Sequence, residues 1–250
     1  MATKNVLITG AGSGFGKLAA VALVERDHQV IATTETEDQA SELRREVPSL
    51  RVEKLDITTD DVDKVHAWPI DVLVNNAGAG ETGPLADVPM DRVRRLFEVN
   101  VFGTLKVTQA VLVDMVPRRS GRIIIMSSIA GVLAAPAFGP YSMTKHALEA
   151  MGKSMRGELA PLGIDVTLIN PGPYLTGFND RMAQSMWEWF NERSLNAPEA
   201  ELFRVIGDFV TTGQRDPLEV ANRLVELVEA DTTSENNFVP PDIKAQLGLV

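Results

Sequence analysis

A serine, a tyrosine and a lysine in this chain have a spacing that can form a proton-transfer centre. Ser127 and Ser128 end an apolar run, Tyr141 lies thirteen residues after Ser128, and Lys145 follows Tyr141 by four positions. Residues four apart on a helix share one face, so Lys145 can favour the ionised form of a neighbouring phenol. Taken alone, however, Tyr-x-x-x-Lys is more typical of a solvated surface pair. The rest of the chain therefore decides between the two interpretations.

The composition is that of an ordinary soluble protein and excludes several classes of function. The 250 residues are 44% hydrophobic and 23% charged, which suits one large domain over 1–250. A net charge of −10 argues against nucleic-acid and anionic-membrane partners. No cysteine is present, and three scattered histidines give no ligand spacing, so we expect no metal site. No stretch resembles a signal peptide or approaches the roughly 18 apolar residues of a membrane span, so we expect a cytoplasmic protein.

Short apolar runs alternate with amphipathic stretches along the chain. The runs cover 5–9, 29–33, 51–55, 71–75, 122–127 and 165–170. Helices are expected over 15–26, 37–47, 90–116 and 141–162, with a small helix within 58–69. Runs rich in Val, Ile and Leu without alternation are typical of strands buried on both faces. The pattern predicts an α/β fold, a doubly wound, mostly parallel Rossmann-type sheet with helices on both faces.

Polar residues recur where the predicted strands end. They are Thr9-Gly10, Asp56, Asn75-Asn76, Ser127-Ser128 and Asn170-Pro171-Gly172. Because ligands of such sheets bind at the carboxyl ends of the strands, one crevice should collect them. Asn75 is as well explained by structure as by binding. Asp56 and Thr58 are equally well explained as caps of the next helix.

A glycine-rich turn joins the first predicted strand to the first helix. Glycines at 10, 14 and 16 allow a tight turn and close approach to a pyrophosphate at the helix N-terminus. A purely structural tight turn is the alternative. Lys17 follows Gly16 but is followed by Leu18, which does not fit the triphosphate-binding P-loop motif.

Together these motifs resemble the single-domain branch of the short-chain dehydrogenase/reductase family over roughly residues 4–230. The matching residues are Thr9-Gly10-x-x-x-Gly14-x-Gly16, Asn75-Asn76-Ala77-Gly78, Asn100, Ser128, Tyr141-x-x-x-Lys145 and Pro171-Gly172. The resemblance implies an NAD(P)-dependent alcohol dehydrogenase or carbonyl reductase that interconverts a secondary alcohol and a ketone by hydride transfer. It implies Tyr141 as acid/base, Lys145 lowering its pKa, and Ser128 positioning the substrate oxygen. Asn100 would hold a water that links Lys145 to solvent.

The resemblance also implies a dinucleotide site. Its expected residues are Gly10, Ser13, Gly14, Phe15, Gly16, Thr34, Glu35, Asp56, Ile57, Asn76, Ala77, Gly78, Tyr141, Lys145, Pro171, Gly172 and Thr176. NAD-selective relatives carry an aspartate near Thr34, and NADP-selective ones a cation near Glu35 or Ser13. This chain has neither. Glu35 would repel a 2′-phosphate, which favours NAD over NADP, although Lys17 or Arg44 can still approach.

The stretch 177–215 departs from strand–helix alternation, where relatives carry a lid over the substrate. It contains Met182, Met186, Trp187, Trp189, Phe190, Leu195, Phe203, Ile206 and Phe209. These residues predict an apolar or aromatic substrate, or equally the packing of the lid or a subunit interface. The tail 236–242 is expected to form a short strand and loop.

Two other functions fit the same fold. One is a nucleotide-sensing protein without turnover, and the other is a cofactor-independent, dehalogenase-like relative. The intact glycine turn disfavours the dehalogenase, and the presence of both Tyr141 and Lys145 disfavours the sensor. The resemblance further implies a homodimer or homotetramer built on the helices 90–116 and 141–162.

Overall fold

A sheet of seven parallel strands forms the centre of the described part of the molecule. The computed structural model describes residues 2–246 and 248. In spatial order the strands are β3 (Arg51–Lys54), β2 (Gln29–Thr34), β1 (Asn5–Ile8), β4 (Val72–Asn75), β5 (Gly121–Met126), β6 (Ile164–Pro171) and β7 (Asn236–Val239). The order reverses between β1 and β4, which opens a crevice at their carboxyl ends. The predicted doubly wound parallel fold is confirmed, and each of the six predicted apolar runs matches a strand to within one residue at either end.

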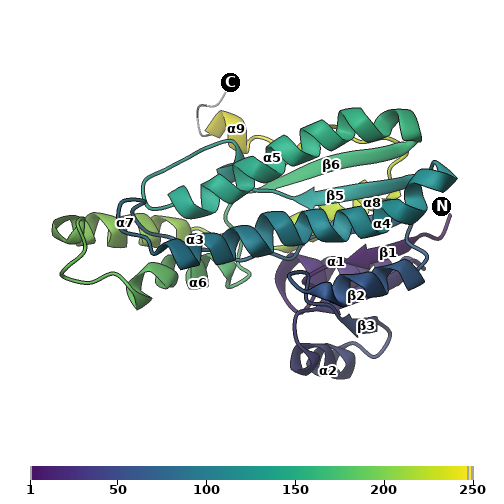
Figure 1. Cartoon of the computed structure of the whole chain (residues 1–250), viewed down its shortest axis with the longest axis horizontal. Helices are drawn as coiled ribbons and strands as arrows, with labels where there is room; N and C mark the ends of the chain where they lie inside the picture. Colours follow the sequence, from purple (N-terminus) through teal and green to yellow (C-terminus); the bar gives the residue numbers. More distant parts are fainter. Residues whose placement is uncertain (1, 247, 249–250) are drawn as a thin grey trace.

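Helices cover both faces of the sheet. One face packs against α1 (Gly14–Val24), α2 (Glu37–Glu46) and α8 (Leu218–Glu229). The other packs against the 3₁₀ helix η1 (Asp60–Ala67), α4 (Thr104–Arg118) and α5 (Gly139–Leu159). Figure 1 shows α4 and α5 side by side in front of the sheet, with α8 behind it. Short 3₁₀ turns η3 (Ile129–Gly131) and η4 (Ala160–Leu162) flank α5, and α9 (Ile243–Gln246) follows β7.

Neighbouring residues of each central strand enter different cores, which is why the strands read as unbroken apolar runs. Val6 and Ile8 of β1 belong to the core beneath α1 and α8, whereas Leu7 belongs to the core beneath α4 and α5. All three side chains are at most 1% exposed. No helix was expected over α8, although its buried residues Val220, Leu224 and Leu227 have helical spacing.

The predicted helix 90–116 is present as three consecutive segments. They are α3 (Met90–Phe97), a π-helical segment η2 (Glu98–Gly103) and α4. The run Met90–Arg118 is long and apolar enough, by length and composition only, to cross a membrane. The expectation that no stretch approaches this length was therefore wrong. Val107, Val111 and Met115 of this run are buried against the sheet, and a core helix of this kind passes the same test.

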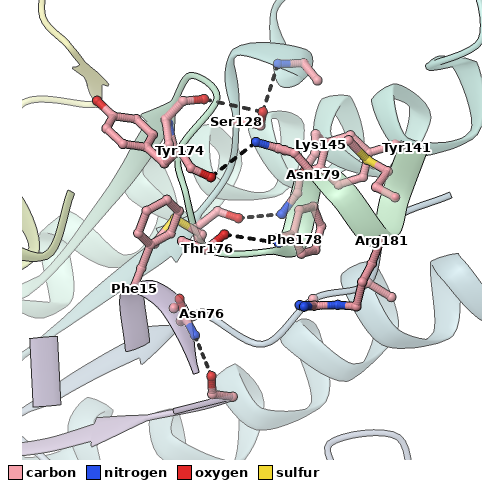
Figure 2. Close-up of a pocket in the computed structure, with 18 of the residues that line it drawn as sticks. Phe15, Asn76, Ser128, Tyr141, Lys145, Tyr174, Thr176, Phe178, Asn179 and Arg181 are labelled. Atoms are coloured by element: carbon pink, nitrogen blue, oxygen red, sulfur yellow. Dashed lines mark hydrogen bonds between the residues drawn. The ribbon is translucent and has the colours of Figure 1, made fainter. Parts of the chain in front are cut away.

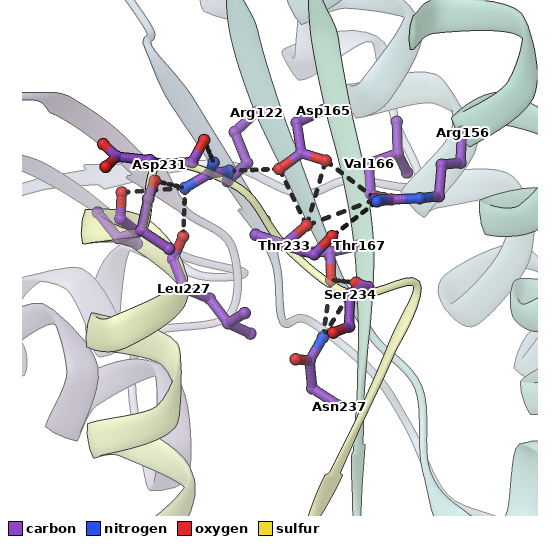
Figure 3. Close-up of polar contacts among 12 residues, drawn as sticks. Arg122, Arg156, Asp165, Val166, Thr167, Leu227, Asp231, Thr233, Ser234 and Asn237 are labelled. Atoms are coloured by element: carbon purple, nitrogen blue, oxygen red, sulfur yellow. Dashed lines mark hydrogen bonds and ion pairs between the residues drawn. The ribbon is translucent and has the colours of Figure 1, made fainter.

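A polar network ties α8 to the amino ends of β5 and β6, opposite the crevice (Figure 3). The buried Arg122 side chain donates to Asp165 Oδ2 at 2.9 Å and to the carbonyls of Leu227 and Ala230 at 2.6 and 2.7 Å. Arg156 donates to the other Asp165 oxygen at 2.9 Å. The carbonyls at the end of a helix lack intrahelical partners, so Arg122 satisfies them and fixes α8 to the sheet.

The expected lid, residues 177–215, extends from the carboxyl ends of the strands, at the left of Figure 1. It comprises α6 (Phe178–Ser185), the 3₁₀ turns η5 (Met186–Glu188) and η6 (Ala197–Glu199), and α7 (Ala200–Thr211). Thr82 after β4 donates its hydroxyl to the Met182 carbonyl at 2.8 Å. Trp189 Nε1 donates to Glu81 Oε1 at 3.1 Å. These buried bonds fix the first half of the lid to the loop after β4.

Candidate active site

A cavity of about 1080 Å³ lies at the carboxyl ends of the strands and extends from the end of β2 to the lid. Figure 2 shows side chains from the first helix, from α5 and from the lid around it. Of the residues predicted to form the site, all line the cavity except Gly16 and Asn100. The predicted crevice is therefore present as a single continuous cavity, and these two residues lie outside its lining.

The glycine turn is held tightly against the end of β4. Gly10 has a φ of +64°, and a Cβ at this position would lie 2.6 Å from the Ala77 Cα. Asn76 Nδ2 donates to the carbonyls of Thr9 and Gly10 at 2.9 Å each. Gly16 was expected to contact a cofactor. The structure instead packs it against this amide, because a Cβ on Gly16 would lie 2.5 Å from Asn76 Nδ2.

The N-terminus of α1 opens into the cavity without a competing negative charge. Ser13 precedes the helix in extended conformation and forms no side-chain cap, and the first turn contains no acidic residue. The Phe15 ring packs edge-on against the Tyr174 ring, with 5.6 Å between the ring centres. A Cβ on Gly14 would lie 3.3 Å from the Thr176 Cβ. Uncapped amides carry the positive end of the helix dipole, so the turn suits a pyrophosphate.

The end of β2 presents an acid and no cation to the cavity. Thr34 is 1% exposed and donates its hydroxyl to the Thr36 carbonyl at 3.0 Å, while Glu35 is exposed and lines the cavity. Gln39 and Glu42, which were not predicted, line it too. Both candidate cations are engaged elsewhere: Lys17 with Glu46, and Arg44 with Glu37 and the Val52 carbonyl.

Asp56 lines the cavity beside Ile57 and closes its own turn. Its Oδ1 accepts hydrogen bonds from the Thr58 amide at 2.9 Å and from the Thr58 hydroxyl at 2.7 Å. The cap of the following 3₁₀ helix is Thr59, whose hydroxyl accepts from the Asp61 amide. The alternative that Asp56 or Thr58 caps this helix was therefore wrong. Asn75 is 3% exposed and donates to Thr108, which makes it a structural residue.

Tyr141 lies in the first turn of α5 and faces the cavity (Figure 2). It is 7% exposed, and its ring lies 5.8 Å from that of Phe178 in the lid. Burial raises the pKa of Tyr141 well above its usual value, and a hydrogen bond with Ser128 opposes this shift. At neutral pH the side chain is therefore a phenol with a proton to donate.

Lys145 is buried one helical turn after Tyr141. Its amine donates to the Met126 carbonyl at 2.7 Å and lies 5.5 Å from the centre of the Tyr141 ring. Burial lowers the pKa of Lys145 to about 8, and the charge of Glu149 opposes this shift. Lys145 was expected to lower the Tyr141 pKa. The structure shows the opposite net shift, because the cost of burying a phenolate dominates.

The two adjacent serines have different surroundings. Ser127 is 2% exposed and donates its hydroxyl to Glu149 Oε1 at 2.5 Å. Ser128 lines the cavity together with Tyr141, and its hydroxyl accepts from the Ala130 amide at 3.1 Å. The selection of Ser128 by its spacing to Tyr141 thus agrees with the geometry, and Ser127 belongs to the interior.

Asn100 supports the cavity floor from the π-helical segment. Its Oδ1 accepts from the Ala79 amide at 2.7 Å, and its Nδ2 donates to the Ala79 carbonyl at 2.9 Å and to Thr144 at 3.0 Å. The side chain thereby fixes the residues after β4 to α5. A Cβ on Gly78 would lie 3.3 Å from Asn100 Oδ1 and 3.9 Å from Lys145 Nζ, so Asn100 and Lys145 are close neighbours. π-Helical turns of this kind are frequent at functional sites.

The end of β6 closes the site opposite the glycine turn. The Pro171 carbonyl lies 3.5 Å from the Ser128 hydroxyl, and the Gly172 amide donates to the Val239 carbonyl at 2.9 Å. Thr176 accepts from the Phe178 amide at 3.3 Å at the start of α6. Pro171, Gly172, Thr176 and Ala77 all line the cavity, as predicted.

The apolar residues of the lid divide into two groups. Trp187, Trp189, Phe190 and Phe203 pack on one another and on Met186, and none of them lines the cavity. Met182, Val205, Ile206, Phe209 and Val210 line it. Packing thus explains the tryptophans, while a second set of side chains forms an apolar wall.

Several lining residues were not predicted. Phe138 and Pro136 lie three and five residues before Tyr141, so their proximity in the sequence could have identified them. Arg181 carries no comparable signal. In Figure 2 its guanidinium lies below Phe178, to the right of Asn76. Ile243 and Gln246 come from α9, about a hundred residues after Tyr141 in the sequence. Only the fold brings them to the cavity.

Several known oxidoreductases are similar to this chain. The chain is 38% identical over 242 residues to the uncharacterized oxidoreductase YusZ of Bacillus subtilis, covering 91% of this chain and 85% of that protein. It is 35% identical to a 3-ketodihydrosphingosine reductase of Bacteroides thetaiotaomicron, covering 72% and 67%. A solved short-chain dehydrogenase from Streptomyces avermitilis has a TM-score of 0.81 at 28% identity, covering 99% and 96%.

Solved structures of this fold hold either form of nicotinamide dinucleotide. An actinorhodin polyketide ketoreductase variant with NADPH has a TM-score of 0.78 at 26% identity, covering 95% of both chains. A Burkholderia phymatum protein in complex with NAD shares the fold at a TM-score of 0.81 and 23% identity, covering 98% and 92%. The family model for short chain dehydrogenase matches residues 4–187. This chain is therefore an oxidoreductase of the short-chain dehydrogenase/reductase family.

Proposed function

We propose that this protein is an NAD(P)-dependent oxidoreductase that interconverts a ketone and a secondary alcohol. The observation that supports this most directly is the convergence of Ser128, Tyr141 and Lys145 on one cavity, which the hydroxyl-bearing side chains of Ser128 and Tyr141 both line. A ketone oxygen between these two hydroxyls would accept a hydrogen bond from each. That arrangement polarises the carbonyl and holds it in place.

Tyr141 supplies the proton in the reducing direction. When bound, a nicotinamide dinucleotide supplies a hydride to the carbonyl carbon, or accepts one from the carbinol carbon. The carbonyl oxygen gains the phenolic proton of Tyr141 as its π bond opens, and a phenolate remains. Ser128 keeps its proton and stabilises the developing charge on the oxygen. The raised pKa of Tyr141 keeps the phenol protonated at neutral pH, and the Lys145 ammonium, 5.5 Å from the ring, offsets the phenolate charge.

The residues present suit the dinucleotide along the whole cavity. The uncapped N-terminus of α1 fits the pyrophosphate, and a Cβ on Gly14 would fill the space before Thr176. Asp56 and Ile57 would flank the adenine, and Pro171 and Gly172 the nicotinamide.

We propose NAD as the preferred form. Glu35 and Glu42 line the end of the cavity that would receive the adenine ribose, whereas Lys17 and Arg44 are engaged with other partners. A 2′-phosphate there would face carboxylates without a compensating cation. A ribose hydroxyl could donate a hydrogen bond to Glu35 instead.

The substrate is expected to be apolar around its carbonyl. Leu133, Phe138, Phe178, Met182, Ile206 and Phe209 surround the space beyond Tyr141. Apolar walls with few polar groups bind by burying hydrocarbon and leave orientation to those polar groups. The relative named as a 3-ketodihydrosphingosine reductase is a ketone reductase by name, which supports the reaction class.

A second copy of the chain is the partner we propose. Phe102 and Val113 of the η2–α4 run and Met143 of α5 are 52%, 59% and 43% exposed, which gives these helices apolar outer faces. Light scattering on the purified protein would detect a dimer or tetramer. A monomer at all concentrations would contradict this proposal.

The reaction is tested by mixing purified protein with NADH or NADPH and a panel of ketones and following the nicotinamide absorbance. Turnover that is lost in Tyr141→Phe, while dinucleotide binding is retained, supports the proposal. Tyr141→Phe with full activity would refute the assigned role. Binding without turnover in either direction would favour the nucleotide-sensing alternative, and turnover without a dinucleotide the dehalogenase-like one.

A further inference from the structure

A buried carboxylate beneath the candidate active site has no role in the proton transfer described above. Glu149 lies one helical turn after Lys145 on α5 and is 4% exposed. A buried carboxylate is costly unless hydrogen bonds and charges compensate it. Its surroundings should therefore indicate what it does.

Three neutral side chains from three strand ends donate to this carboxylate. Ser127 and Asn170 Nδ2 each donate to Oε1 at 2.5 Å, and Asn236 Nδ2 donates to Oε2 at 2.7 Å. An ionised carboxylate only accepts hydrogen bonds, so three converging donors match it. Lys153 Nζ lies 3.7 Å from Oε2 at the helix surface and supplies a partly screened countercharge.

The donors are the direct neighbours of residues in the site. Ser127 precedes Ser128 at the end of β5, and Asn170 precedes Pro171 at the end of β6. Asn170 Nδ2 also reaches the Ser128 carbonyl at 3.3 Å, and Asn236 at the start of β7 donates to Asn170 Oδ1 at 3.1 Å. One carboxylate thus fastens the ends of two strands that contribute to the cavity wall.

Close packing leaves little freedom at this point. A Cβ on Gly131, in the turn after Ser128, would lie 2.6 Å from the Ser127 hydroxyl and 3.0 Å from Glu149 Cγ. The same position is 3.1 Å from the Lys145 carbonyl. The turn that carries Ser128 therefore lies directly on the helix that carries Tyr141 and Lys145.

The carboxylate also acts through its charge. Tyr141, His146 and Glu149 are ionisable groups on the α5 turns around Lys145; of these, His146 is exposed and its ring lies 2.9 Å from the Ser142 carbonyl. Met126, Ser127, Asn170 and Asn236, on or next to the strands packed there, are neutral. Residues four apart on a helix are close neighbours, and interactions between charges strengthen away from water. The charge of Glu149 raises the pKa of Lys145 against the effect of burial.

We propose that Glu149 is a positioning residue of this centre: it fixes the ends of β5 and β6 against α5 and places a buried negative charge one helical turn from Lys145. This inference rests on the proposed function for its effect on turnover. Its effect on Lys145 does not depend on any reaction.

The first test measures Lys145 directly. Protein labelled with ¹³C-lysine is titrated by NMR, and the Lys145 signal is assigned by its loss in Lys145→Met. Glu149→Gln removes the charge with little change in shape, and we expect Lys145 to titrate about one pH unit lower. Glu158→Gln is the matched control, because Glu158 is an exposed acid on the same helix whose carboxylate accepts from the Ser154 hydroxyl at 2.6 Å. Its Lys145 titration should equal that of the wild type.

Two further variants separate charge from position. Ser127→Ala removes one donor and keeps the carboxylate, so the midpoint of thermal unfolding should fall while the Lys145 titration stays unchanged. Glu149→Asp keeps the charge on a shorter side chain and remains informative if Glu149→Gln does not fold. We expect its Lys145 to titrate close to the wild type and its kcat to fall about tenfold.

The outcomes for the proposed function and for this inference are distinguishable. If the wild type reduces ketones, the alkaline limb of its pH profile should shift to lower pH in Glu149→Gln, in parallel with the NMR titration. If the wild type turns over no substrate but the NMR shift occurs, the proposed function fails and the charge effect on Lys145 holds. An unmoved Lys145 titration in Glu149→Gln, with a lower thermal midpoint as the sole change, would overturn the inference.

Discussion

The amine of Lys145 donates to the Met126 carbonyl at 2.7 Å, while it lies 5.5 Å from the centre of the Tyr141 ring. Both groups are buried, so each favours its neutral form. The pKa of Tyr141 is raised, and the pKa of Lys145 is lowered to about 8. In the proposed reaction the tyrosine therefore carries its proton at neutral pH, and the lysine is the group that titrates near neutral pH.

Ketone reduction should decline as the pH rises through about 8. The Lys145 ammonium offsets the phenolate that Tyr141 becomes, and it loses its proton in this range. The measurement is kcat/KM for the dinucleotide at saturating ketone, because this quantity reports the pKa values of the free enzyme. A profile that stays flat from pH 6 to about 10 would exclude Lys145 as the titrating group.

Replacing Lys145 by methionine should stabilise the fold and abolish turnover. The folded-state pKa lies below the unfolded-state value, so the cost of burying the ammonium is fully present below pH 8 and disappears as the pH rises to that of free lysine. Losing the bond to the Met126 carbonyl offsets part of this gain. We expect a net stabilisation of about 1–2 kcal/mol at pH 7, measured by urea denaturation. If Lys145→Met were less stable than the wild type at pH 7, this prediction would be wrong. The stabilisation of the variant should vanish near pH 10.

The sequence predicts best what local spacing determines. Ser128, Tyr141 and Lys145 follow one another at short range, and one strand end and one helix turn suffice to bring them together. Glu149 has the same helical spacing from Lys145, but its donors Asn170 and Asn236 come from other strands, so the sequence does not identify its role. The Tyr141 pKa was mispredicted because a motif specifies a neighbouring cation but not the extent of burial. The tryptophans of the lid were ambiguous for a similar reason. Composition alone does not distinguish side chains that pack on one another from side chains that line the cavity.

Reversing the charge at Glu35 should shift the cofactor preference. Glu35→Arg would place a cation at the end of the cavity that now presents carboxylates. A charge-assisted hydrogen bond contributes about 1.5–3 kcal/mol, so KM for NADPH should fall roughly 10- to 100-fold. Asp38→Arg is the matched control, because Asp38 is exposed in the first turn of α2, three residues after Glu35, and does not line the cavity. If both variants lowered KM for NADPH equally, the change would come from the overall charge of the protein and not from a cation at the cavity.

The two adjacent serines should respond differently to alanine. Ser128→Ala removes a hydroxyl from the cavity and should lower kcat about 100-fold or more with little change in thermal stability. Ser127→Ala removes a buried donor to Glu149, which should cost about 1–3 kcal/mol of stability and leave most of the turnover. Thermal unfolding and steady-state kinetics on both variants provide the comparison. A larger loss of kcat in Ser127→Ala than in Ser128→Ala would reverse the assignment.

Phe209 should contribute to binding of ketones that have a long apolar substituent. It lines the cavity from α7 although it is 78% exposed, so it lies at the mouth, where the far end of an extended substrate would emerge. Leu195 is also 78% exposed and does not line the cavity, which makes Leu195→Ser a control of equal exposure. Covering an aromatic side chain with hydrocarbon contributes about 1.5 kcal/mol or more, so Phe209→Ser should raise KM for a long-chain ketone roughly tenfold. KM for a short ketone should stay unchanged, because a short substrate would not reach the mouth. A parallel rise for short and long ketones would instead indicate that α7 supports the shape of the whole site.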